Sequence, residues 1–373
     1  MKRALVLFQI VCIFSTAILA GRVATKKNDT LVLLHVLFRH GNRTPDKASV
    51  FPNDLYLSET YEPIGYSQLT NKGKQTEYEI GKYLRKTYGQ LIPEQYSPDV
   101  IYAISTNLKR TKMSLELVLT SLFPPLPTEF GSPDLNWQPI PFNIEQAGGI
   151  LGVASSYCAD YINAYFKYVL SKDAQKIRDG YKNLYEELSR YAGFKVTTPR
   201  DAGSIYFTLK SEDDYGLQLP DWATGIYPEL LEEAASVDYE FSTANPTLKK
   251  LSAGFLLKKI LEDSISKRDG NLPEERKAFL YSAHEFNVGT MLRILNVFYR
   301  HVPPFGATIF FEIHNIDGDY GLKLYYQDYT KATPKILTIP GCSSFCKLDQ
   351  LYEIVQENLP GENDVCSTSD EVF

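Results

Sequence analysis

Hydrophobic residues gather in short continuous runs along this chain, and each run ends in polar residues. Runs of this length, rich in aliphatic and β-branched side chains, are typical of strands buried on both faces of a parallel sheet. The three runs span residues 31–38, 100–104 and 277–282. Helical periodicity follows each of them, over residues 69–86, up to Leu122 before a Pro-Pro pair, and over residues 286–299.

The repeated order of strand, polar turn and helix predicts the α/β class, with a mainly parallel sheet and helices on both of its faces. Two further apolar segments, residues 308–314 and 321–327, flank the sequence Asn-Ile-Asp-Gly-Asp, which indicates a hairpin. A long helix over residues 245–270 has good capping residues at both ends and precedes the third strand. An amphipathic helix over residues 347–358 closes the chain.

The middle of the chain breaks this pattern. Helical stretches are expected over residues 157–170 and 174–191, and another follows a segment rich in Pro and Gly. We therefore expect an inserted, mostly helical cap domain over residues 137–239. The large α/β domain would then be discontinuous and formed by residues 21–136 and 240–373.

The two ends of the chain indicate export. Met1-Lys2-Arg3 precedes an apolar stretch, residues 4–19, with small residues near Ala20, which predicts a secretory signal peptide over residues 1–20. The C-terminal residues carry no apolar tail, so we expect no membrane anchor and a soluble, secreted protein. Asn28 begins an N-glycosylation sequon in a polar lead-in to the first strand.

Charge and cysteine content narrow the class of protein further. The net charge of the 373 residues is −6, which disfavours a nucleic-acid partner. Cys12 would leave with the signal peptide, and the even number that remains is typical of two disulfides in an oxidising compartment. The remaining residues are Cys158, Cys342, Cys346 and Cys366. Their sequence leaves the pairing open, while their scatter fits a zinc site poorly.

Chemically active side chains follow the first predicted strand. Arg39, His40 and Arg43 come directly after it. Ligands bind at the carboxyl ends of parallel strands. Two guanidiniums that lie close together require an anion between them, and the fork geometry of arginine suits a phosphate best. A histidine between them can serve as a nucleophile or as an acid/base. The alternative interpretation is a strand end whose arginines are solvated or paired with surface carboxylates.

The other two strand ends contribute Arg110 and the adjacent pair His284 and Glu285. In one parallel sheet these positions converge although the chain separates them, as phosphoryl transfer requires. Taken alone, Arg110 would be more typical of a solvated helix face and His284 of a buried structural histidine. The chain contains no G-x-S-x-G or P-loop sequence and too few histidines for a binuclear metal phosphatase.

The string Arg39-His40-Gly41-Asn42-Arg43-Thr44-Pro45 behind a buried strand resembles the signature of the histidine acid phosphatases, which belong to the phosphoglycerate-mutase-like superfamily. The segments Ser105-Thr106-x-x-x-Arg110-Thr111 and Tyr281-Ser282-Ala283-His284 resemble further motifs of that family. Asn42 begins a second formal sequon, but its place inside this string argues against glycosylation. Because its C-terminus lacks an apolar tail, the sequence most resembles the secreted animal members of this family, which include acid phosphatases of insect venoms.

The resemblance implies a role for each polar side chain. His40 would attack phosphorus and form a phosphohistidine, and Glu285 would protonate the leaving alcohol. The phosphate oxygens would be held by Arg39, Arg43, Arg110 and His284. Water would then hydrolyse the intermediate without a metal or another cofactor, and the substrates would be small phosphomonoesters. The resemblance also implies the disulfides Cys158–Cys366 and Cys342–Cys346, and it leaves a homodimer open, since relatives often dimerise.

Glu285 departs from the commoner family pattern, which has aspartate at this position. Glutamate reaches one methylene further, so Asp46 is an alternative proton donor. His-Glu forms also occur among relatives that cleave inositol polyphosphates, which leaves a phytase-like activity open. A catalytically weak secreted protein that binds phosphorylated ligands is the remaining alternative. An acid pH optimum is expected, because the donor carboxyl must be protonated while the surrounding arginines keep the imidazole neutral.

Overall fold

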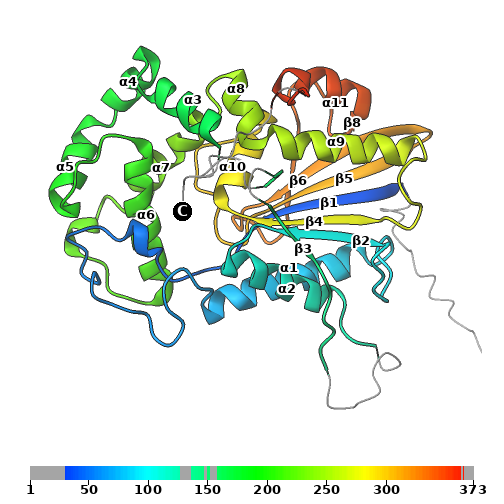
Figure 1. The fold of residues 1–373 in the computed structure, drawn as a ribbon, viewed down its shortest axis with the longest axis horizontal. Coiled ribbons are helices and arrows are strands. Elements are labelled where there is room, and N and C mark those ends of the chain that lie inside the picture. Colours follow the sequence, from blue (N-terminus) through cyan, green and yellow to red (C-terminus); the bar gives the residue numbers. More distant parts are fainter. Residues whose placement is uncertain (1–29, 127–135, 147–148, 152–157, 363, 365–373) are drawn as a thin grey trace, which may run out of the picture.

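The computed structural model describes residues 30–126, 136–146, 149–151, 158–362 and 364, and Figure 1 shows their arrangement. The strands are β1 (Leu31–Arg39), β2 (Ile101–Ser105), β3 (Asn143–Ile144), β4 (Ala278–Ala283), β5 (Thr308–Ile316), β6 (Asp319–Gln327), β7 (Lys335–Leu337) and β8 (Cys346–Lys347). The α-helices are α1 (Asn71–Tyr88), α2 (Lys109–Leu122), α3 (Ala159–Val169), α4 (Lys172–Asp179), α5 (Lys182–Ala192), α6 (Pro199–Tyr215), α7 (Glu229–Phe241), α8 (Pro246–Lys249), α9 (Phe255–Arg268), α10 (Glu285–Ile294) and α11 (Leu348–Val355).

One mixed sheet carries the fold, with the strand order β3-β2-β4-β1-β5-β6-β7 and β8 paired to β6. The strands β3, β2, β4 and β1 are parallel neighbours, whereas β5 to β8 pair in antiparallel fashion. The α/β class is confirmed. The three apolar runs form the parallel half, and the hairpin expected from the Asp-Gly turn forms β5 and β6 and extends the sheet.

Helices cover both faces of this sheet, with α1 and α2 on one side and α9 and α11 on the other (Figure 1). The central strand β1 serves both layers. Leu34 and Val36 pack with Ile80, Leu84 and Leu115 of α1 and α2. Leu33 and Leu37 belong instead to the cluster that includes side chains of α9, α10 and α11. The continuous apolar run is therefore explained by burial on both faces.

The helices α3 to α7 lie beside the sheet (Figure 1) and enclose cores of their own, in which Ile205 of α6 packs with Leu231 of α7. Before these helices, Asn143 and Ile144 still pair in parallel with β2 as β3. The stretch expected as one helix over residues 174–191 is two helices, because α4 ends at Asp179 with Gly180 as its C-cap and α5 begins at Lys182.

Three further helical segments differ from the sequence expectation. The helix α6 was not anticipated, although Thr198 and Asp201 form a capping box and Pro199 occupies its first turn. The helix expected over residues 245–270 contains a buried π-helical turn between α8 and α9. The helix after His284 ends at Ile294 instead of residue 299.

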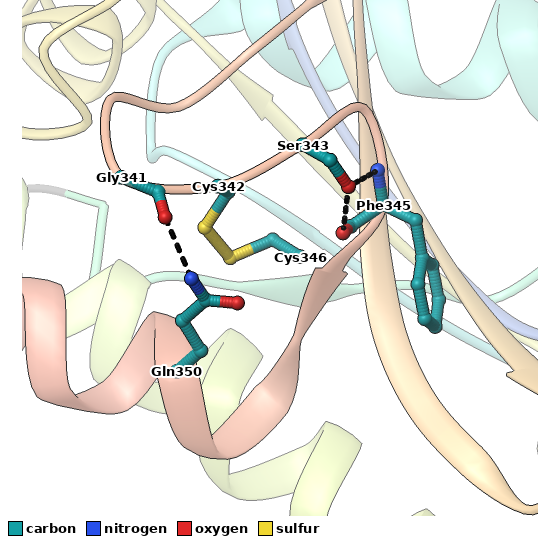
Figure 2. Close-up of a disulfide and its surroundings, with 6 residues drawn as sticks. All are labelled: Gly341, Cys342, Ser343, Phe345, Cys346 and Gln350. Carbon is teal, nitrogen blue, oxygen red and sulfur yellow. Dashed lines mark hydrogen bonds between the residues drawn. A yellow bond between two sulfur atoms is a disulfide. The ribbon is translucent and has the colours of Figure 1, made fainter.

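Cys342 and Cys346 form a disulfide that closes the loop before β8 (Figure 2). Gln350 of α11 donates its amide to the carbonyl of Gly341 at 2.6 Å, so the loop is attached to both the sheet edge and the last helix. Cys158 is fully buried and disulfide-bonded. The expected partner Cys366, the signal sequence and Asn28 lie outside the described residues. Within the described ranges, no helix combines the length and apolar character needed to cross a bilayer.

Candidate active site

The carboxyl ends of β1, β2 and β4 lie side by side because the register aligns them. Phe38 of β1 and Ser105 of β2 both pair with Ser282 of β4. The chain then leaves β1 through Gly41, where a Cβ would stand 2.3 Å from the carbonyl oxygen of Gly73 at the start of α1. Only glycine therefore allows this close approach of loop and helix.

His40 is almost fully buried, and both of its ring nitrogens have partners. Its Nδ1 lies 2.9 Å from the carbonyl oxygen of Gly41, and Arg110 donates its Nε–H to His40 Nε2 at 3.1 Å. The proton therefore resides on Nδ1, and the lone pair resides on Nε2. Burial, followed by the charges of Arg110 and Arg39, holds the pKa of His40 well below its usual range.

His284 stands at the N-terminus of α10 with its ring centroid 5.5 Å from that of His40. Its Nε2 lies 3.0 Å from Oγ1 of Thr106. That hydroxyl donates to Thr111 Oγ1, so its oxygen accepts the Nε2–H of His284. Burial, and then the charge of Arg110, lowers the pKa of His284 to about 3, which leaves a neutral imidazole that donates through Nε2.

Arg39 is a buried cation with an unused donor. Its Nη1 donates to the carbonyl of Pro303 at 2.6 Å, and its Nε lies 3.5 Å from Oε2 of Glu285. The guanidinium carbon stands 3.9 Å from the ring centroid of Phe305, which is cation–π geometry. Its Nη2 finds no hydrogen-bond partner among the described residues. A buried guanidinium with an unpaired donor favours an anionic ligand.

Arg43 has more hydrogen-bond and ion-pair partners than Arg39. Its Nη1 donates to Thr44 O at 2.9 Å and to Ser211 Oγ at 3.4 Å, and its Nη2 lies 2.7 Å from Oδ2 of Asp46. Burial lowers the pKa of Arg43 to about 10, so it is still a cation at neutral pH. Its Nε has no partner within the described part of the chain.

The carboxylate of Glu285 also lies in this site. Its side chain is 21% exposed and is paired with Arg39. Burial would raise the pKa of Glu285, but the charges of Arg39 and Arg43 outweigh it and lower the pKa. The carboxyl group is therefore ionised when no substrate phosphate is present.

The comparison with known families decides what kind of site this is. A family model of the histidine phosphatase superfamily (branch 2) matches residues 30–327, which include all three strand ends. This chain belongs to the histidine phosphatase superfamily.

The relatives of this histidine phosphatase include acid phosphatases of several animals. The venom acid phosphatase of Apis mellifera is 33% identical over 355 residues, which cover 89% of this chain and 86% of that protein. The prostatic acid phosphatase of Bos taurus is 31% identical over 343 residues, with 90% and 87% covered. The solved structure of Hafnia alvei phytase with myo-inositol hexakis sulphate has a TM-score of 0.66 at 17% identity and covers 91% of this chain and 99% of its own. At that identity the likeness concerns the fold.

The six side chains that sequence reasoning selected for phosphate chemistry lie together in this histidine phosphatase. They are Arg39, His40, Arg43, Arg110, His284 and Glu285. Three cations, two neutral imidazoles and one carboxylate can bind a phosphate dianion, attack it and exchange a proton with it. In the described residues, no group of three or more His, Cys, Asp or Glu side chains has the arrangement of a metal site.

Sequence reasoning missed the part of this site that α6 supplies. Asp214 accepts a hydrogen bond from Nδ2 of Asn42 at 2.9 Å, and it is paired with Lys72 at 2.9 Å and Lys210 at 2.7 Å. Asn42 is 6% exposed, so its side chain supports the loop from within. The capping box of α6 was the one signal in the sequence that could have revealed this helix.

Proposed function

We propose that this histidine phosphatase is a secreted acid phosphatase that hydrolyses phosphomonoesters through a phosphohistidine on Nε2 of His40. The observation that carries the proposal is the state of this imidazole, since its proton faces a backbone carbonyl and its lone pair faces Arg110. A neutral histidine with a fixed tautomer is a competent nucleophile at acid pH, where an ordinary histidine would be protonated.

Phosphoryl transfer then proceeds in two balanced steps. The Nε2 lone pair of His40 gives up the hydrogen bond from Arg110 and forms an N–P bond while the P–O bond to the alcohol breaks, and the alcohol oxygen takes the proton of Glu285. Water next attacks phosphorus and gives a proton to the Glu285 carboxylate. The N–P bond breaks, its electron pair returns to His40, and inorganic phosphate leaves.

The cations stabilise the charge on the phosphoryl oxygens in both steps. Arg39 supplies the unpaired Nη2, and Arg43 supplies the unpaired Nε. Arg110 contacts the nucleophilic nitrogen itself, which places its guanidinium beside the transferred group. The neutral His284 would add a further donor when its Nε2–H exchanges Thr106 for a phosphoryl oxygen. Fixed donors in a buried site stabilise such charge more strongly than water does.

The role of Glu285 as proton donor requires a protonated carboxyl. In the substrate-free site the neighbouring cations keep it ionised. A bound phosphate dianion would pair with Arg39 and Arg43 and add negative charge beside the carboxylate, and both changes raise its pKa. Protonation of Glu285 is therefore linked to substrate binding, which supports an optimum on the acid side of neutral.

The experiment that tests this proposal uses an aryl phosphomonoester across a pH series in EDTA. Wild type is expected to turn over and to retain label from radioactive substrate after rapid quenching, as an acid-labile phosphoramidate. His40→Ala is expected to lose both. His314→Asn is the matched control, since this buried histidine pairs with Leu31 at the opposite end of β1 and bonds Thr30 and Glu312. Turnover without label, or with equal label in His40→Ala, would contradict the phosphohistidine.

Secretion and quaternary structure are parts of the same proposal. The residues 1–20 have the pattern of a signal peptide, and the protein contains a disulfide, Cys342–Cys346. We expect expression in insect cells to deliver the protein to the medium with a new N-terminus near Ala20. We include a homodimer in this proposal, and analytical ultracentrifugation tests it by measuring the molecular mass in solution. Retention inside the cell with an intact N-terminus would contradict secretion.

A further inference from the structure

A carboxylate already occupies the space between two of the proposed phosphate ligands. Oδ2 of Asp46 lies 2.7 Å from Nη2 of Arg43, and Oδ1 of Asp46 lies 3.4 Å from Nη1 of Arg110. The two arginines come from different elements, the loop after β1 and the first turn of α2. Asp46 therefore bridges them as a bound anion would.

The bridge lies next to the nucleophile. The same guanidinium of Arg110 that contacts Asp46 through Nη1 contacts Nε2 of His40 through Nε. A phosphoryl group bonded to Nε2 must lie within reach of this guanidinium. A single guanidinium group therefore separates the Asp46 carboxylate from the atom that is proposed to attack phosphorus.

The position of Asp46 is held by its surroundings. Ser67 donates its hydroxyl to Oδ1 of Asp46, and its backbone N–H donates to Pro45 O at 3.0 Å. The carbonyl of Asp46 accepts the N–H of Ser49 at 2.9 Å. Because the backbone on both sides of Asp46 is hydrogen-bonded, the loop holds the carboxylate in its position beside the two arginines.

We propose that Asp46 is an internal counter-anion, which the substrate phosphate must displace from Arg43 and Arg110 before it can bind. This inference rests on the phosphate site proposed above and adds a residue that sets its affinity. A dianion that enters the site meets a carboxylate on the same donors. Either the carboxylate swings away or it takes up a proton and becomes a hydrogen-bond donor to the phosphate.

The groups that face Asp46 decide when its carboxyl group takes up a proton. They are Arg43 from its own loop, Arg110 from α2, His284 from the start of α10, and Ser67. Burial raises the pKa of Asp46, but the charges of Arg43 and Arg110 outweigh it and lower the pKa in the free site. When phosphate takes over these cations, the carboxyl loses its stabilising charges and its pKa rises. Phosphate binding is therefore expected to consume a proton at Asp46.

If Asp46 had a different role, its removal would change the affinity for phosphate in the opposite direction. If its carboxylate only holds Arg43 and Arg110 in place, its removal would leave the arginines less ordered and weaken phosphate binding. If the carboxylate competes with phosphate, its removal frees two donors and strengthens binding. The sign of the change in phosphate affinity thus separates the two roles.

The experiment is calorimetric titration of inorganic phosphate into wild type and Asp46→Asn at several pH values. Near neutral pH we expect Asp46→Asn to bind about tenfold tighter, the effect of one freed charge-assisted contact. The ratio of the two affinities is expected to shrink as pH falls, because the wild-type carboxyl becomes protonated in the complex. Titrations in buffers of different ionisation enthalpy should show that wild type takes up more protons than Asp46→Asn.

Asp263→Asn is the matched control, because Asp263 is also a half-buried carboxylate, but it pairs with Lys259 on α9 at 2.9 Å. It should leave the pH dependence of phosphate affinity as in wild type. Asp46→Ala is the second variant if Asp46→Asn fails to fold. Weaker or equal binding by the Asp46 variants, a ratio independent of pH, or no phosphate binding by either protein would overturn the inference. Tighter binding without any turnover would refute the proposed enzyme and leave the role of Asp46 standing.

Discussion

Arg110 donates its Nε–H to Nε2 of His40 at 3.1 Å, although Arg110 lies in the first turn of α2 and His40 in the loop after β1. This contact ties a proposed phosphate ligand, whose side chain is 13% exposed, to the proposed nucleophile. The same guanidinium contacts Asp46 through a second nitrogen. Two contacts from one planar group need the fork of arginine, and a lysine ammonium cannot reproduce them.

Arg110→Lys is therefore expected to lower kcat/KM for aryl phosphates by about 100-fold or more, the usual effect of a lost donor to a developing oxyanion. Steady-state kinetics at constant pH measure this change. The neighbouring Lys109→Met is the control, because Lys109 is exposed at the start of α2 and should leave kcat/KM unchanged. Equal losses in both variants would mean that the loss in Arg110→Lys does not come from the contact with His40, and would contradict the assigned contact.

Glu285→Gln is expected to affect substrates according to their leaving group. An alkyl phosphate such as glycerol phosphate needs a proton on its leaving oxygen and should lose about 100-fold to 10,000-fold in kcat, whereas a nitrophenyl phosphate should lose little. Glu285→Asp should restore most of the activity on the alkyl phosphate, because it keeps a carboxyl group. A uniform loss across leaving groups would mean that Glu285 only holds Arg39 in place.

Inositol hexakisphosphate is expected to be a poorer substrate than a simple monophosphate. Phosphates on adjacent ring carbons would lie close to the Asp46 carboxylate that bridges Arg43 and Arg110, and like charges disfavour that approach. The ratio of kcat/KM for the two substrates should move toward the polyphosphate in Asp46→Asn. A wild-type preference for the polyphosphate would contradict this expectation and favour a phytase-like function.

The carboxyl pair formed by Asp54 and Glu212 predicts how the stability of the fold depends on pH. Asp54 Oδ2 and Glu212 Oε1 are buried and lack a donor within the described chain, so the pair is satisfied when one of the two groups carries a proton. Burial and the charge of Asp54 raise the pKa of Glu212 to about 8. In the unfolded chain glutamate titrates near its usual value, so this contribution is fully present below about pH 4.5 and is lost as pH rises to about 8.

The free energy of unfolding of wild type should therefore fall by about 2 kcal/mol relative to Glu212→Gln over that range. This fall follows from the linkage between protonation and folding. Urea unfolding at several pH values measures it. Glu186→Gln is the control, since Glu186 forms an exposed pair with Lys182. Parallel curves for wild type and Glu212→Gln would show that the two carboxyl groups do not share a proton.

The sequence was most informative where local pattern and burial agree. The run from Leu31 to Phe38 predicted β1 correctly because every residue in it except the partly buried Val32 is buried on one face or the other. The clustering of Arg39, Arg110 and His284 followed from parallel pairing, which needs no side-chain detail.

Contacts that depend on loop conformation could not be predicted in the same way. The bridge from Asp46 to Arg43 and Arg110 depends on the turn that Ser67 closes, and no periodicity encodes that turn. Helix ends were also uncertain, since Gly180 ends α4 where the apolar pattern continues. The support that Asp214 gives to Asn42 requires knowing where α6 docks.

The position of β1 in the sheet has a consequence for how the protein is made. On each side β1 is hydrogen-bonded to strands that are translated much later, with Leu34 opposite Ala278 of β4 and Val36 opposite Phe310 of β5. A nascent chain thus carries its central strand with both edges open until residues 278–316 have left the ribosome. Pairing over such sequence distances is slow and leaves apolar strands open to aggregation. A premature stop anywhere before β4 therefore abolishes the whole site, because the earliest residues of the sheet are the last to find their neighbours.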